Sequence, residues 1–581
     1  MQATQEPTGR ERRKRIFAAF TVLSLLLVAG GVVGLAPPAA TVESADARID
    51  ELFAELDRPD APGAAVLVVY EGEVVYRKGF GQADLERATP ISPSTVFDIA
   101  SVSKQFAGMA VAMLIEEGRV DPAADLRIYL PELPDFGPTV TVDHLIHHTS
   151  GIRDWPGTLA VAGWRMDDVI SFDQILTMAR NQRDLNFAPG AEYSYSNTGY
   201  NVLAELVSRV AGMSFRAWTE AHLFGPLGMR DTHFHDDHTE VVRRRALGYA
   251  RANDGFANVA NGLTALGSSS LYTTVDDLAK WILNFETARV GGPRVVERMR
   301  RRGVLNDGDT IAYAFGQSAG RYRGAATWSH TGSWAGFRTV LVRVPEHRFG
   351  VVILSNSAEY DPTSRAYRVA DVVLENVLGP RAAAPDATDP NGGSGAQGAV
   401  DVPFRLLAEY AGTYRLGPGW LVTITHGDEG LTAQATNEAS FPMTAVSQSE
   451  FFVEAYGASM TFGRADGGGA VNHLLYRDIR APRVEPITRP LDRLDEYEGE
   501  FYSEELDTTY RMSVRDGVLV AHHRRHGDVE LTPVLRDEFL GSQWFIPSLE
   551  FDRGDRGEVT GFRITQGRSR NLRFELRGRA R

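Results

Sequence analysis

Residues 97–104 read Phe-Asp-Ile-Ala-Ser-Val-Ser-Lys (FDIASVSK), and the interpretation of the whole chain starts from this stretch. Ser101 and Lys104 open a run in which apolar residues recur at three- and four-residue steps, the pattern of an amphipathic helix. Three residues are nearly one helical turn, so both side chains are predicted to point the same way. A serine hydroxyl is a weak nucleophile until a base removes its proton, and a desolvated lysine can act as that base. The helix N-terminus adds backbone N–H groups that stabilise developing negative charge.

Lysine is rare in this chain, which makes Lys104 more informative. Of 61 lysine and arginine residues, only four are lysines. Arginine keeps its charge in proteins, whereas a buried lysine can lose its proton. A lysine retained against such a bias is therefore a candidate base.

Composition limits the possible functions. A length of 581 residues predicts several domains, and 43% hydrophobic with 23% charged residues is globular composition. The net charge of −14 argues against a nucleic-acid partner. The absence of cysteine excludes disulfide scaffolds, thiolate metal sites and cysteine nucleophiles. No metal and no cofactor is expected.

The first 40 residues predict export. A basic block at residues 10–15 precedes an uncharged run at residues 16–36, which is long enough to span about 30 Å as a helix. Ala39 and Ala40 offer small residues for cleavage. Residues 1–40 are therefore predicted to be either a cleaved signal peptide or a single membrane anchor. If the segment is cleaved, the rest of the chain is released to the periplasm or outside the cell. If it is an anchor, the chain stays attached to the cytoplasmic membrane with the catalytic domain outside.

Residues 44–378 are predicted to form an α+β domain. The expected elements are a strand hairpin at 64–70 and 74–80, a helix at 202–210 that Gly212 ends, paired strands at 339–344 and 350–354, and a closing helix at 367–378. Residues 379–400 have no apolar period and are rich in Gly, Pro, Ala and Asp, which predicts a linker.

The C-terminal part contains a repeat with an offset of 87 positions. The matched residues are Leu407, Tyr410, Gly412 and Tyr414, which return as Leu494, Tyr497, Gly499 and Phe501. Each copy alternates apolar and polar residues and is large enough for a small core of its own. Two antiparallel β-barrels are predicted, at residues 401–488 and 489–581.

Two further motifs carry side chains suited to catalysis. Tyr195 and Asn197 lie two residues apart just before the helix at 202–210, where a phenol could relay protons and an amide could hold a substrate carbonyl. His330, Gly332 and Ser333 lie in a predicted strand or turn, where a glycine can let a ligand approach the backbone closely.

Taken in chain order, Ser101-x-x-Lys104, Tyr195-x-Asn197 and His330-x-Gly332 resemble the three motifs of the serine β-lactamase and penicillin-binding-protein superfamily. The branch it resembles contains class C β-lactamases, D-Ala-D-Ala carboxypeptidases, D-aminopeptidases and esterases. The resemblance covers about residues 46–378. It implies a β-lactamase/transpeptidase-like α+β domain, with an antiparallel sheet flanked by helices and a helical subdomain. Two following barrels, lipocalin-like, are similar to D-aminopeptidase architecture.

The resemblance also implies roles for the motif residues. Ser101 would be the acylated nucleophile, Lys104 and Tyr195 would share general base and acid work in either order, and Asn197 would bind the substrate amide. The backbone N–H groups of Ser101 and Ser333 would form the oxyanion hole. His330 departs from the pattern, because many β-lactamases carry lysine there and a histidine is largely neutral at pH 7. Arg338 is one candidate for the missing cation.

Three other motifs have plainer explanations. Gly316-Gln317-Ser318-Ala319-Gly320 matches a nucleophile elbow, but no helix pattern follows it. His147-His148 lacks partners at a metal-ligand spacing, and Asp276-Asp277 is interpreted as a helix cap.

The sequence therefore predicts an exported serine hydrolase that acts through an acyl-enzyme on an amide or ester. A D-amino-acid peptide from the cell wall is the favoured substrate, as for a D-aminopeptidase or a D-Ala-D-Ala carboxypeptidase. A carboxylesterase or weak β-lactamase on the same site is one alternative. A non-catalytic acylatable sensor or scaffold is another.

Overall fold

The computed structural model describes residues 44–380, 400, 402–427, 430–436, 438–465, 469–477, 479–487 and 493–578. The predicted signal or anchor segment at residues 1–40 lies outside this range, as do residues 381–399 of the predicted linker. Within the described residues, none of the helices has both the length and the apolar character needed to cross a membrane.

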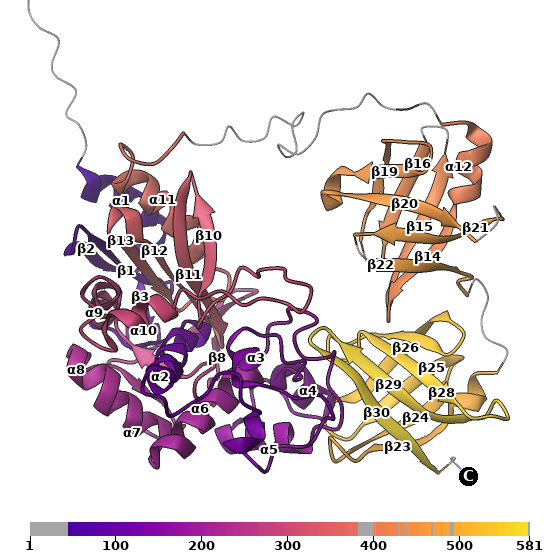
Figure 1. The fold of residues 1–581 in the computed structure, drawn as a ribbon, viewed down its shortest axis with the longest axis horizontal. Helices are drawn as coiled ribbons and strands as arrows, with labels where there is room; N and C mark the ends of the chain where they lie inside the picture. The colour runs from indigo at the N-terminus through magenta and orange to yellow at the C-terminus, as the bar shows by residue number, and fades with distance from the viewer. Residues whose placement is uncertain are drawn as a thin grey trace, which may run out of the picture. The chain divides into compact units, whose positions relative to one another are not determined.

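A six-stranded antiparallel sheet lies at the centre of the first domain (Figure 1), in the order β10-β11-β12-β13-β1-β2. Its strands are β1 (Ala64–Tyr70), β2 (Glu73–Phe80), β10 (Ser318–Tyr322), β11 (Ala325–Trp334), β12 (Phe337–Val344) and β13 (Phe349–Ser355). The pairing of β1 with β13 joins the two ends of the domain. Both strand pairs predicted from the sequence are present.

Helices cover both faces of this sheet. They are α1 (Ala45–Phe53) and α11 (Pro362–Val373) on one face, and α2 (Lys104–Glu116) and α9 (Val275–Thr287) on the other. Successive strand residues point to opposite faces. Val66 therefore packs in the apolar core on the α1 and α11 face, and Leu67 packs in the core on the α2 and α9 face. With two buried faces, β1 needs no polar alternation, and its first six residues are all buried apolar side chains.

One predicted helix start and one predicted helix cap are wrong. The closing helix begins at Pro362 instead of residue 367, because the Asp361 side chain accepts the backbone N–H groups of Thr363 and Ser364. It ends at Val373, before the predicted residue 378. In α9, Thr274 is the cap, and the acidic pair Asp276-Asp277 lies in the first turn.

A helical region stands beside the sheet and carries part of the cleft. It contains α3 (Val142–Ile146), α4 (Trp155–Val161), α5 (Phe172–Asn181), α6 (Asn197–Ala211) and α7 (Phe215–Thr219). The Ser196 side chain caps α6 by accepting the N–H of Gly199, and Gly212 ends the helix in a left-handed conformation, as predicted. Tyr195 and Asn197 are therefore placed at a rigid helix start.

Short elements complete the domain. They are β3 (Gln82–Asp84), β4 (Thr89–Pro90), β5 (Phe97–Asp98), β6 (His233–Phe234), β7 (Gly248–Ala252), β8 (Gly255–Val259), β9 (Leu271–Thr273), α8 (Gly225–Leu227) and α10 (Gly292–Arg298).

The first C-terminal barrel is a nine-stranded antiparallel sheet that curls almost closed. After α12 (Phe404–Tyr410) its strands are β14 (Gly412–Gly417), β15 (Trp420–Gly427), β16 (Gly430–Ala435), β17 (Ser440–Pro442), β18 (Thr444–Ala445), β19 (Glu450–Val453), β20 (Ala458–Arg464), β21 (Val471–Tyr476) and β22 (Ile479–Val484). Its two edge strands are β17 and β18, which Met443 alone separates along the chain, so the edges must meet.

The second barrel is closed. Its eight strands are β23 (Gly499–Ser503), β24 (Thr508–Arg515), β25 (Val518–His523), β26 (Gly527–Leu535), β27 (Glu538–Gly541), β28 (Ser548–Arg553), β29 (Val559–Gln566) and β30 (Ser569–Gly578). Corresponding residues of the sequence repeat make corresponding contacts. Tyr410 packs on Phe451 with ring centroids 5.7 Å apart, and Tyr497 packs on Phe539 at 5.1 Å. The two predicted barrels are confirmed.

Candidate active site

Ser101 lies in a tight turn between the short strand β5 and helix α2. Residues Ala100–Ser103 form one 3-10 turn, and Ala100 adopts a left-handed φ of 46°. The buried carboxylate of Asp98 accepts the N–H of Ala100 at 2.8 Å and fixes this turn. A left-handed alanine is a strained conformation that the surrounding structure must hold in place.

Lys104 is the first residue of α2 and is fully buried. Its Nζ lies 3.1 Å from Oγ of Ser101, as the spacing predicts. Nζ also donates to Oδ1 of Asn197 and to the carbonyl of Ser268, both at 2.7 Å. Burial lowers the pKa of Lys104 well below its ordinary value, although Asp154 opposes this effect. A neutral amine has two N–H groups, so with both donated to carbonyl oxygens its lone pair is left for Ser101.

A buried carboxylate that sequence analysis did not identify, Asp154, supports Asn197. It accepts the backbone N–H of Asn197 at 2.7 Å and its side-chain Nδ2 at 3.2 Å. Asn197 therefore bridges Asp154 and Lys104, and its amide orients the lysine. Burial raises the pKa of Asp154, which Arg568 and Asn197 counteract.

Tyr195 completes the polar group around the nucleophile. Its phenol interacts with the Ser101 side chain, and its ring centroid lies 4.8 Å from Nζ of Lys104. Burial raises the pKa of this phenol above its ordinary value, and the interaction with Ser101 opposes the shift only in part. The phenol is thus protonated at neutral pH and is a proton donor.

His330 lies on β11 as an uncharged ring. Its Nδ1 lies 2.7 Å from the carbonyl oxygen of Thr331, which can only accept, so Nδ1 carries the proton. Nε2 consequently accepts from the Tyr313 hydroxyl at 3.0 Å. Burial is the main cause that lowers the pKa of His330, to about 3. His330 does not supply the cation that lysine supplies in many β-lactamases.

Gly332 is needed for the packing of β11. A Cβ at this position would lie 2.2 Å from Oγ1 of Thr339 and 2.3 Å from the carbonyl oxygen of Ile99. The missing side chain lets β11 lie directly against the turn that holds Ser101. The next residue, Ser333, lines the cleft.

The cation in the cleft comes from the second barrel. Arg568, in the turn between β29 and β30, lies 3.0 Å from Oδ2 of Asp154 and 5.2 Å from the Tyr195 ring centroid. The neighbouring Ser569 hydroxyl donates to the backbone carbonyl of Asp154 at 2.9 Å. Arg338, the candidate from the sequence, does not line the cleft.

The same barrel is held against the first domain by buried polar contacts. Arg153 pairs with Glu505, and both side chains are buried. The Tyr510 hydroxyl donates to the carbonyl of Val161 at 3.0 Å. Ala160 and Val161 of α4 belong to the apolar core of the barrel itself.

The cleft above Ser101 has a volume of about 500 Å³. It is lined by Ser101, Trp155, Pro156, Tyr193, Tyr195, Asn197, Leu263, Ser268, Ser269, Tyr313, Ser318, Ser329, His330, Thr331, Ser333, Trp334 and Arg568. The structure thus brings Ser101, Tyr195, Asn197, His330 and Ser333 to one cleft, with Lys104 directly beneath the nucleophile.

Residues 49–374 match the family described as Beta-lactamase. The chain belongs to the β-lactamase family. Membership agrees with the α+β fold and with the three motifs in their order along the chain.

Two relatives and one structure illustrate the range of this family. Penicillin-binding protein 4* of Bacillus subtilis (strain 168) is 25% identical over 448 residues, 74% of this chain and 96% of that protein. The D-aminopeptidase of Gluconobacter oxydans (strain 621H) is 28% identical over 317 residues, 54% of this chain and 59% of the relative. The octameric penicillin-binding protein homologue from Pyrococcus abyssi shares the fold, with a TM-score of 0.51, 20% identity, and coverage of 82% of this chain and 97% of that chain. The chain is a serine hydrolase of the β-lactamase family.

The remaining sequence motifs have structural explanations. Ser318 of the elbow-like motif begins strand β10, and no helix follows it. His147 bonds backbone carbonyls of Asp143 and Arg301 at 3.1 Å each. His148 accepts the N–H of Ser196 at 3.1 Å, and its ring centroid lies 4.3 Å from that of Tyr195, so it supports the site from behind.

Proposed function

We propose that this hydrolase cleaves an amide or ester bond through an acyl-enzyme on Ser101, with Lys104 as the first base. The observation that carries the proposal is the buried Lys104 amine, 3.1 Å from Oγ of Ser101 and with two carbonyl acceptors for its N–H groups. Burial favours the uncharged form of this amine, and its position aims it at the proton it must take.

Each proton in the acylation step has a place to go. The Ser101 proton moves to Nζ of Lys104 while Oγ attacks the substrate carbonyl carbon. The resulting oxyanion accepts hydrogen bonds from the backbone N–H groups of Ser101 and Ser333. The leaving group then takes the phenol proton of Tyr195, and the Lys104 ammonium returns a proton to the phenolate. Water repeats the sequence on the acyl-enzyme and releases the acid.

Assigning the acid role to Tyr195 follows from burial. A phenol with a raised pKa stays protonated at neutral pH and cannot start the reaction as a base. Lys104, with a lowered pKa, can. The two environments move the pKa of each group toward its proposed task.

The charges of the cleft favour a substrate with a free carboxylate over one with a free amine. Among the described residues that line it, none is Asp or Glu, and Arg568 is the one charged side chain. Asp154 takes one N–H of Arg568, and the side chain is still 45% exposed. We therefore propose an acylated peptide that ends in D-residues, as in cell walls, consistent with the penicillin-binding protein relative. This substrate requires the export that residues 1–40 predict.

The test compares two substrates that differ at their ends. One is an N-acetylated peptide ending in D-Ala-D-Ala, and the other is D-alanine amide with a free amine. The proposal predicts a higher kcat/KM for the acetylated peptide and no activity in Ser101→Ala. Faster cleavage of the amine substrate would refute the carboxylate preference but not the acyl-enzyme. Turnover confined to short-chain esters would instead support the carboxylesterase alternative.

A further inference from the structure

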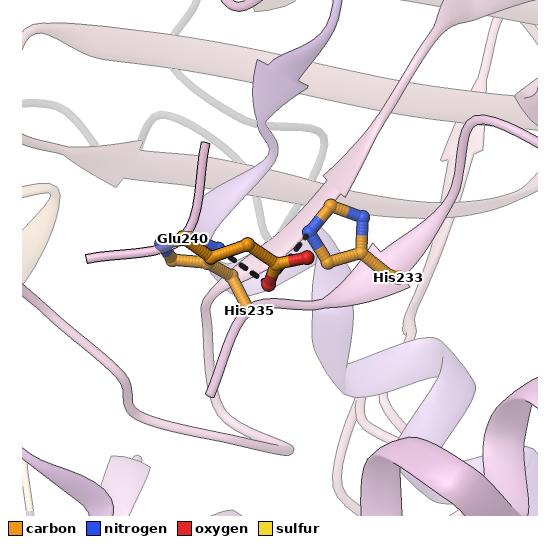
Figure 2. Close-up of side chains that lie close together, drawn as sticks. All are labelled: His233, His235 and Glu240. Atoms are coloured by element: carbon orange, nitrogen blue, oxygen red, sulfur yellow. Dashed lines mark ion pairs between the residues drawn. The ribbon is translucent and has the colours of Figure 1, made fainter. Parts of the chain in front are cut away.

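A second cluster of chemically active side chains lies outside the cleft. His233 belongs to strand β6, which pairs with β9, and His235 follows two residues later. Residues two apart in an extended chain point to the same side. The chain then turns back and brings Glu240 against both imidazoles (Figure 2).

The three side chains are spaced like ligands of one ion. Oε2 of Glu240 lies 4.0 Å from Nε2 of His233 and 3.7 Å from Nδ1 of His235. The three ligand atoms all lie within 4.8 Å of one another. These separations are too long for hydrogen bonds. Two atoms bound to one Zn²⁺ at about 2.1 Å in tetrahedral geometry are about 3.4 Å apart, so small side-chain rotations would close the site.

The two facing nitrogens have no other partner. Nε2 of His233 and Nδ1 of His235 are both buried atoms without a hydrogen bond in the described structure. His235 is only 2% exposed. A buried polar atom without a partner costs free energy, so two that converge on one carboxylate require an explanation.

We propose that His233, His235 and Glu240 bind one divalent transition-metal ion of the Zn²⁺ class. Two imidazoles and a carboxylate form a ligand set that zinc uses in proteins, whereas Mg²⁺ and Ca²⁺ prefer oxygen ligands alone. The proposal differs from the sequence-based expectation of no metal.

Arg216 supports the carboxylate from its far side. Its Nη1 donates to Oε2 of Glu240 at 2.6 Å and its Nη2 to Oε1 at 2.9 Å, and Nη1 also contacts Asp236. Such outer contacts orient a ligand. Because the guanidinium also shares the charge of Glu240, the two imidazoles must supply most of the binding, which favours Zn²⁺, Co²⁺ or Ni²⁺.

The site is structural and connects to the active site through the backbone. His233 and Glu240 line a hollow with Arg230, Arg243 and Arg244, from which a water or small anion can complete the coordination. The N–H of His235 donates to the carbonyl of Ser270 at 2.8 Å. Ser270 lies two residues from Ser268, whose carbonyl accepts from Lys104. The ion would hold residues 233–240 in one conformation, and the His235 N–H joins them to the segment that supports the base.

The test uses the full chain, purified with a tag that contains no histidine and stripped of metal with a chelator. Zn²⁺ bound after equilibrium dialysis is measured by elemental analysis, and Co²⁺ is added separately to record its visible spectrum. The variants are His233→Ala, chosen because this side chain is 20% exposed and tolerates replacement, and Glu240→Gln. His238→Ala is the matched control, since His238 is exposed in the same segment.

The proposal predicts one equivalent of Zn²⁺ at micromolar free metal, a tetrahedral Co²⁺ spectrum and a raised melting temperature. His233→Ala should lose all three, Glu240→Gln should bind at least tenfold more weakly, and His238→Ala should match the wild type. Absence of binding by the wild type, or equal binding by His233→Ala, would overturn the proposal. Circular dichroism of the metal-free variants separates loss of the site from loss of the fold.

Discussion

Replacing Arg568 with methionine tests whether the second barrel tunes the catalytic lysine. Methionine keeps much of the side-chain length and removes the charge. Arg568 is one of the groups that lower the pKa of Lys104, after burial, which is the largest cause. Without the guanidinium, the pKa of Lys104 should rise. Because Lys104 acts only when neutral, activity falls as pH drops through its pKa, so the acidic limb of the kcat/KM profile should move to higher pH.

The size of this shift follows from the geometry. Nζ of Lys104 and Cζ of Arg568 lie 4.8 and 5.2 Å from the centroid of the Tyr195 ring, so the two cations are at most 10.0 Å apart, the sum of these distances. At an effective dielectric constant of about 20, two unit charges at that distance repel by about 1.7 kcal/mol. Arg568 is 45% exposed, and solvent reduces this to about 1 kcal/mol. The expected displacement is therefore about 0.7 pH unit.

The assay is the pH dependence of kcat/KM on a neutral nitrophenyl ester, which has no charge for Arg568 to bind. Arg570→Met is the matched control, because Arg570 lies on the same hairpin but pairs with the exposed Glu192. The double variant Asp154→Asn/Arg568→Met removes both charges and should return the limb toward its wild-type position. An unmoved limb in Arg568→Met, or an equal shift in Arg570→Met, would refute the reasoning.

Three further substitutions have defined outcomes. Tyr195→Phe removes the proposed acid and should lower kcat about 10²–10⁴-fold for amides. The loss should be smaller for activated nitrophenyl esters, because their leaving group needs no proton. Equal losses for both substrate types would argue against the acid role. His330→Lys adds a cation to a cleft that lacks one at this position. Stopped-flow measurement should show about tenfold faster acylation by penicillins, because a charge-assisted hydrogen bond contributes about 1.5 kcal/mol or more. An unchanged acylation rate would contradict this prediction. Arg153→Met leaves the buried Glu505 carboxylate without its paired cation and should destabilise the packed barrel by about 3–5 kcal/mol. The melting temperature should fall, and Arg153→Met/Glu505→Met should largely restore it. No change would show that this pair does not hold the barrel in place.

These single substitutions test the barrel more cleanly than its removal. Deleting residues 401–581 would remove Glu505, the partner of Arg153, and would expose Ala160 and Val161, which pack in the barrel core. A change in substrate preference after deletion would then have two inseparable causes, the loss of Arg568 and the local unfolding of α4.

The sequence contained the parts of the site that depend on local spacing. Ser101 and Lys104 are one helical turn apart, so their contact follows from the helix alone. The repeat at 87 positions predicted both barrels, because repeated apolar positions such as Tyr410 and Tyr497 fill equivalent places in each core.

The parts that the sequence did not predict depend on contacts between distant segments. Asp154 and Arg568 are separated by most of the catalytic domain and both barrels, and no spacing rule connects them. The role of Gly332 depends on the carbonyl of Ile99, which tertiary packing brings against it. The histidine pair at 233 and 235 was a missed signal, since residues two apart in an extended chain share a side.

The most direct test of the central claim is intact-mass analysis of the protein after reaction with a fluorescent penicillin, comparing wild type with Ser101→Ala. The proposed mechanism predicts one covalent adduct per chain in the wild type and none in the variant. An adduct of equal yield in Ser101→Ala would show that another residue is acylated, and the assignment of Ser101 as the nucleophile would be wrong.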